Sequence, residues 1–126
     1  MALGRAIEVN EAFRILKDPV RRAEALLARR GVPSGEGKEP AASPALLMEV
    51  MERREALADA RQTKNEASLA RLIAEVSEAR TRTEAALSRE FASPSADPTE
   101  ILKRIGELRY YRRFLEEAAS IADDLL

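Results

Sequence analysis

The sequence predicts an all-α protein, with a C-terminal antiparallel three-helix bundle preceded by two shorter helices. Strand signals are absent, because no run of β-branched or aromatic residues alternates with a period of two. Ala, Leu, Glu and Arg dominate the 126 residues, which are 45% hydrophobic and 34% charged. This composition supplies enough apolar residues for a core and does not indicate disorder. The connections between the last three predicted helices are short, which favours antiparallel neighbours.

Glycine and proline concentrate in one segment of the chain. Residues 31–44 (GVPSGEGKEPAASP) contain three of the five glycines and three of the six prolines, without apolar periodicity. Such a composition is typical of a linker or a long surface loop. We therefore expect three parts: an N-terminal segment at 1–31, a linker at 32–44 and a helical domain at 45–126.

Helix start and stop signals define two helices before the linker and one after it. The first spans about residues 2–17 and has four apolar residues on one side: Ala6, Val9, Phe13 and Leu16. Asp18 and Pro19 form the N-cap and first position of the second helix, which Gly31 ends. Ser43 and Pro44 repeat this start signal for a third helix that reaches about residue 60.

Two longer helices complete the predicted bundle. The fourth spans about residues 65–91, and Asp97 and Pro98 start the fifth, which runs to about residue 124. At 100° per residue, the fourth helix has a single apolar stripe, as expected for a helix that faces a core. The stripe consists of Leu69, Leu72, Ile73, Val76, Leu87 and Phe91.

The third helix has more apolar surface than a bundle requires. Leu46, Val50 and Leu57 cluster within about 40° and are expected to face the bundle. A separate arc, roughly 100–200° from Leu46 by the same geometry, carries apolar side chains beside carboxylates. The members of this arc and its edge are Leu47, Met48, Met51, Glu52 and Glu55. Methionine suits an adaptable contact surface, because its side chain is flexible and polarisable.

The fifth helix shows the same duplication of apolar faces. We assign the core stripe to Ile101, Ile105, Leu108, Leu115 and Ala119. A second side carries Tyr110, Phe114 and Ile121, with Arg109 and Arg113 between the two sides. Aromatic residues, Met and Arg are enriched in the centres of protein interfaces, so these extra faces indicate a protein-binding surface. The alternatives are that they pack against the two N-terminal helices, or that the helix limits differ from the predicted ones by a few residues.

The composition argues against catalysis and against metal binding. The chain contains neither histidine nor cysteine, which excludes Ser-His-Asp triads, thiol nucleophiles and the common zinc sites. The carboxylates Glu49, Glu52, Glu55 and Asp59 have helical spacing, but no histidine accompanies them. We therefore expect no enzyme activity, no catalytic residue, no metal site and no cofactor.

The charge and hydropathy patterns narrow the class of partner. The net charge of −1 argues against a polyanion, so no nucleic-acid partner is expected. No apolar run approaches the roughly 20 residues that span a bilayer, so no membrane partner is expected and the protein is predicted to be cytoplasmic.

Three blocks of the sequence resemble HscB-type J-protein co-chaperones. Residues 7–13 (IEVNEAF), 16–19 (LKDP) and 22–27 (RAEALL) look like the end of a J-domain and the segment after it. Residues 46–57 (LLMEVMERREAL) resemble the LMEQMELREEL-like helix of that family, and residues 105–111 (IGELRYY) resemble its terminal KLRYL-like helix. Residues 1–31 would then be the C-terminal remnant of a J-domain.

The resemblance implies a helper in iron–sulfur cluster biogenesis. Family members bind the cluster scaffold protein IscU through a C-terminal three-helix bundle and present it to HscA, a DnaK-like chaperone ATPase. Carried over position by position, the scaffold-binding residues would be Leu47, Met48, Met51, Glu52, Glu55, Arg109, Tyr110 and Arg113. The alternative function is a non-catalytic helical module for self-association or for an adaptor role.

One element of the family pattern is missing from the sequence. The His-Pro-Asp motif of the J-domain, which contacts the ATPase, should precede the helix at 2–17, but the chain contains no histidine. We therefore expect either a truncated chain or a start codon assigned too late, and a polypeptide that lacks the ATPase-stimulating motif. The first helix would then have lost its usual neighbour, and its apolar side is expected to dock on the second helix and to form a homodimer contact.

Overall fold

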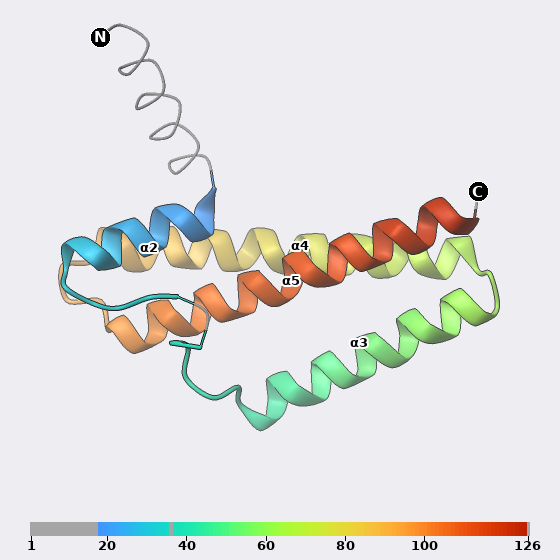
Figure 1. The fold of residues 1–126 in the computed structure, drawn as a ribbon, viewed down its shortest axis with the longest axis horizontal. Coiled ribbons are helices and arrows are strands. Elements are labelled where there is room, and N and C mark those ends of the chain that lie inside the picture. Colours follow the sequence, from blue (N-terminus) through green and yellow to red (C-terminus); the bar gives the residue numbers. More distant parts are fainter. Residues whose placement is uncertain (1–17, 36, 126) are drawn as a thin grey trace, which may run out of the picture.

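The described part of the chain consists of α-helices joined by short turns and one extended linker. The computed structural model describes residues 18–35 and 37–125. It contains α2 (Pro19–Arg29), α3 (Pro44–Gln62), α4 (Glu66–Ala92) and α5 (Pro98–Leu125), as Figure 1 shows. No strand occurs within these residues, and the predicted all-α class is confirmed. The predicted helix at 2–17 lies outside the described residues.

α2 and α3 begin at the capping residues that the sequence predicts, Asp18 and Ser43. The Asp18 carboxylate accepts hydrogen bonds from the N–H groups of Val20 and Arg21, at 3.0 and 3.2 Å. Ser43 caps α3 and Asn65 caps α4 in the same manner. These side chains satisfy N–H groups that have no partner inside a first helical turn. For the four described helices, each predicted end lies within about two residues of the observed one.

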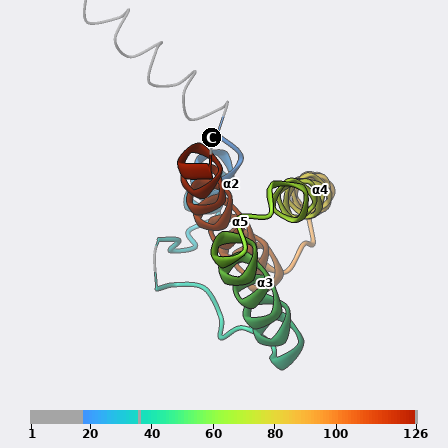
Figure 2. The same ribbon diagram turned by 90° about the vertical axis from the view of Figure 1, so that its right-hand side faces the viewer.

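The three long helices, α3, α4 and α5, reverse direction from each one to the next (Figure 1). α4 and α5 form an antiparallel pair along most of their length, and α2 lies beside them (Figure 1). α3 meets α4 at their shared turn, where Lys64 adopts a left-handed φ of 52°, and it diverges from α4 toward its own N-terminus (Figures 1 and 2). The start of α3 is therefore the end of the bundle with the least cover.

The core lies between α4 and α5 and extends to α2. In α4 the predicted residues Leu69, Leu72, Val76 and Leu87 are buried, while Ile73 and Phe91 are half-buried. Sequence reasoning did not identify Ala79 and Thr83, which are also buried. From α2, the side chains of Val20, Ala23 and Leu27 join the same apolar cluster.

The prediction for α5 requires a correction. Ile101, Ile105 and Leu108 are buried as predicted, but Leu115 is half-buried and Ala119 is exposed. The side assigned as surplus is instead part of the core, since Tyr110, Phe114 and Ile121 are buried. The physical reason is that α5 is the central helix, with α4 on one side and α2 and α3 on others (Figure 2), so it needs two apolar faces.

None of the described helices combines the length and the apolar character that a membrane-crossing helix requires.

Candidate protein-binding surface

Three large hydrophobic side chains of α3 remain exposed. Among the described residues, Leu47, Met48 and Met51 keep 52%, 62% and 70% of their surface accessible. They lie on one side of the helix, because residues three and four positions apart are neighbours on a helical surface. We call these three residues the α3 patch. A contiguous exposed apolar group of this kind is characteristic of an interaction site.

The rest of α3 explains why this patch is left over. Leu57 and Ala60 are buried, and Val50 packs against the core, so these residues hold the helix on the bundle. They lie on a different side from the patch, as the sequence predicts. A helix at the edge of a bundle can bury only one face, and the patch is on the face that none of the other described helices covers.

Carboxylates border the α3 patch. Glu52 and Glu55 are exposed and lie along the same side of α3, toward its C-terminal half. We call them the acidic edge. An apolar centre with a charged rim is the usual organisation of a protein-binding surface. The surface can therefore bury apolar side chains of a partner and attract basic groups around them.

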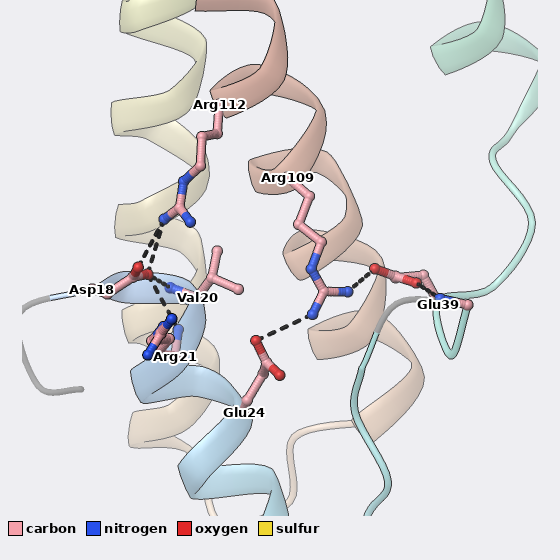
Figure 3. Close-up of polar contacts among 8 residues, drawn as sticks. Asp18, Val20, Arg21, Glu24, Glu39, Arg109 and Arg112 are labelled. Carbon is pink, nitrogen blue, oxygen red and sulfur yellow. Dashed lines mark hydrogen bonds and ion pairs between the residues drawn. The ribbon is translucent and has the colours of Figure 1, made fainter. Parts of the chain in front are cut away.

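Arg109 lies away from the α3 patch, between α2 and the linker. Its guanidinium bonds to the Glu24 carboxylate of α2 at 3.1 Å and also to the carboxylate of Glu39 in the linker (Figure 3). The Arg109 side chain is only 13% exposed. The structure therefore does not bring Arg109 together with the patch residues, although it was assigned to the same site by resemblance.

Tyr110 and Arg113 line a pocket next to α3. The pocket has a volume of about 200 Å³ and lies between the linker, the start of α3 and α5. Tyr110 is 9% exposed, and its hydroxyl has no hydrogen-bond partner among the described residues. Burial raises the pKa of Tyr110, against the opposing effect of the nearby Arg53. Arg113 lines the same pocket and is exposed.

The linker contributes residues that sequence reasoning did not identify. Glu39, Pro40 and Ser43 form a wall of the same pocket, and Gly106 and Glu107 of α5 form another part. Burial raises the pKa of the Glu107 carboxyl, although Arg104 and Lys103 oppose the shift. The linker has no apolar periodicity, so no signal in the sequence placed it against α5.

A family model described as the HSCB C-terminal oligomerisation domain matches residues 42–119, which is more than half of the chain. This match includes α3, α4 and most of α5, and therefore the α3 patch and the acidic edge. The chain belongs to the HscB family. The HscB-type resemblance is thereby confirmed, and the match includes the sequence blocks at 46–57 and 105–111.

Individual relatives of the HscB family agree with this assignment. A co-chaperone protein HscB homolog of Burkholderia multivorans is 44% identical over 76 residues, which cover 60% of this chain and 43% of the relative. The homolog of Burkholderia mallei is 42% identical over 80 residues, or 64% of this chain and 46% of the relative. The chain thus spans less than half the length of these curated relatives.

A solved structure also matches the fold. The chaperone HscB from Vibrio cholerae superposes with a TM-score of 0.80 at 30% sequence identity. The match covers 100% of this chain and 72% of that one. The HscB-like arrangement of helices is therefore present in this chain.

Proposed function

We propose that this chain binds an IscU-type iron–sulfur scaffold protein through the α3 patch and the acidic edge. The comparisons place the chain in the HscB family, and the proposal adds a co-chaperone role, the partner and the surface. The observation that carries it is the exposure of Leu47, Met48 and Met51 on one side of α3. Burying such side chains in a partner is favourable in proportion to the apolar area removed from water.

The role of the scaffold-bound chain would be presentation to an HscA-type ATPase. The resemblance assigns ATPase stimulation to a His-Pro-Asp motif, which this chain of 126 residues does not contain because it has no histidine. The proposal therefore separates two tasks. The described helices bind the scaffold, and stimulation requires a motif that is not in this sequence. No catalytic step is assigned to the chain.

The test compares wild type with the double variant Leu47→Ala, Met51→Ala. Isothermal titration with the IscU-type scaffold should show affinity reduced by about 30-fold or more, because truncating two central anchors costs roughly 2–4 kcal/mol of binding. The melting temperature should be nearly unchanged, since both side chains are exposed. A lower melting temperature with unchanged affinity would refute the assignment.

Charge reversal and added salt test the role of the acidic edge in scaffold binding. Glu52→Lys and Glu55→Lys should weaken scaffold binding, and the wild-type affinity should fall as salt is added, because exposed charges are screened. Glu75→Lys is the control, since Glu75 is an exposed glutamate on α4 and outside the proposed surface. An affinity that is independent of salt contradicts the role of these charges.

Self-association is the second candidate function. The matching family model is described as an oligomerisation domain, and the same apolar patch could serve two copies of this chain. Light scattering on the chain alone distinguishes the two candidates. A dimer that Leu47→Ala and Met51→Ala dissociate favours self-association, while a monomer that binds the scaffold favours the first proposal.

A further inference from the structure

The half of α3 that carries the patch makes few buried contacts of its own. Every residue from Pro44 to Ala56 is exposed or half-buried, and the buried residues of α3, Leu57 and Ala60, lie near its C-terminal end. The direction in which the patch points therefore depends on what holds the first turns of α3. Val50 packs against the core and Arg53 lies over the Tyr111 ring of α5, so the linker that enters the helix is the main candidate for the turns before Val50.

The linker crosses α5 at a glycine. A side chain at Gly106 would place its Cβ 3.1 Å from Cγ of Glu39 and 3.4 Å from Cβ of Glu39. Glycine is unfavourable relative to alanine in the interior of a helix. Its place here allows the close approach of the linker, which a larger residue at this position would obstruct.

A single arginine fixes the linker at this crossing. Glu39 bonds to the guanidinium of Arg109, one helical turn beyond Gly106, and its other carboxylate oxygen accepts the Gly37 N–H at 3.0 Å. Burial would raise the pKa of the Glu39 carboxyl, but these hydrogen bonds and the Arg109 charge lower it below its usual value. The Glu39 carboxylate is therefore held in its charged form against α5.

The fixed point lies close to the start of α3. Ser43 follows Glu39 by only four positions, and its Oγ accepts the Leu46 N–H at 3.2 Å and so caps the helix. A chain of four residues spans at most about 14 Å, so the capping residue cannot move far from α5 while Glu39 is held. Leu47 and Met48 lie in the next turn.

We propose that Arg109, Glu39 and Gly106 form a latch that positions the α3 patch for its partner. Arg109 is then a positioning residue, which acts on scaffold binding through Glu39 and does not touch the scaffold. The inference rests on the proposed function of the patch. It assigns the linker a role in binding, and it differs from the direct contact that the resemblance implies for Arg109.

A double-mutant cycle separates positioning from contact. Arg109→Gln and Glu39→Gln should each lower the affinity for the IscU-type scaffold by about three- to tenfold, and the double variant should bind no more weakly than either single variant. If the two effects multiply, Arg109 acts independently of Glu39 and the latch is wrong. If neither variant changes the affinity while Leu47→Ala with Met51→Ala does, the latch is also wrong, although the proposed function stands.

The matched control uses an ion pair that joins α5 to the first turn of α2. Arg112→Gln breaks the bond from α5 to Asp18 but leaves the linker untouched, so scaffold affinity should stay as in wild type. Hydrogen exchange provides the second readout. Amides of residues 44–51 should exchange faster in Arg109→Gln and in Glu39→Gln, whereas those of residues 57–60 should not. Equal acceleration over both segments would indicate general loss of stability and would overturn the positioning role.

Discussion

The guanidinium of Arg112 in α5 lies 3.0 Å from each carboxylate oxygen of Asp18, the residue that caps α2. One side chain of α5 therefore holds the first turn of α2 while the Asp18 carboxylate also accepts the N–H groups of Val20 and Arg21. This contact joins the segment before the linker to the helix at the end of the chain (Figure 3). Capping and attachment of α2 depend on the same carboxylate.

Replacing Asp18 should separate the contributions of the N-cap and of the ion pair with Arg112 to the free energy of unfolding. Asp18→Ala removes both and should lower the free energy of unfolding by about 1–2 kcal/mol, the usual cost of losing an N-cap. Asp18→Asn keeps a capping side chain and loses only the charge, so it should cost less. Urea unfolding at pH 7 measures both variants. An Asn variant that is as unstable as the Ala variant would show that the ion pair, and not the cap, dominates.

The pH dependence of the Asp18 contribution has a definite sign. Burial would raise the pKa of Asp18, but hydrogen bonds from Arg112 and from the N–H groups of Arg21 and Val20 lower it below 3.8. A lowered pKa in the folded state means that stability is present above the unfolded-state pKa and is lost as the pH falls through the folded-state pKa. The difference between wild type and Asp18→Asn should therefore shrink in acid.

Glu107 should affect stability with the opposite sign. Burial raises the pKa of its carboxyl above 4.5 in the folded state, so ionisation at higher pH disfavours folding. Glu107→Gln should therefore gain stability relative to wild type as the pH rises from 4 to 7, measured by urea unfolding. Glu75→Gln, at an exposed position of α4, is the matched control and should show no such trend. A gain that is the same at both pH values contradicts this assignment.

The correction to the α5 core can be tested at neighbouring positions. Phe114 is fully buried and Arg113 is exposed. Phe114→Ala should lower the free energy of unfolding by about 3–5 kcal/mol, whereas Arg113→Ala should change it by less than about 0.5 kcal/mol. Chemical denaturation measures both. A small effect of Phe114→Ala would indicate that its side chain lies outside the core stripe, as the periodicity of α5 predicts.

The helices could be predicted more completely than their packing. Asp18, Ser43 and Asn65 cap helices through local chemistry, which the sequence carries in full. The exposed face of α3 could also be predicted. That helix packs on the bundle with one face, and it has more apolar residues than one face can bury. Tyr110 and Phe114 could not be assigned correctly, because their burial depends on which helix occupies the centre of the bundle. Periodicity does not contain that information.

The contact between the latch residues Glu39 and Arg109 could not be predicted from the sequence either. Glu39 lies in a segment without periodicity, and its partner Arg109 is 70 residues away in the sequence. Such a contact depends on the tertiary path of the linker. The glycine at position 106 was visible in the sequence, but its role depends on the approach of Glu39, which only the fold reveals.

Loss of ATPase stimulation is expected for this chain. A polypeptide of these 126 residues contains no histidine and therefore no His-Pro-Asp motif. With the scaffold held constant, it should not accelerate single-turnover ATP hydrolysis by an HscA-type ATPase beyond the effect of the scaffold alone. Added to a full-length HscB, it should inhibit, because both compete for one scaffold face. Stimulation equal to that of a full-length HscB would contradict the separation of the two tasks.

The most direct test of the proposed surface uses methionine methyl groups as probes. The chain has three methionines, and two of them, Met48 and Met51, belong to the α3 patch. With ¹³C-methyl-labelled methionine, and with resonances assigned through Met48→Leu and Met51→Leu, the IscU-type scaffold is titrated to saturation. We predict that the Met48 and Met51 methyl signals shift or broaden as the complex forms. Unchanged Met48 and Met51 signals at a scaffold concentration where sedimentation shows a complex would place the binding surface elsewhere and contradict the proposed function of the α3 patch.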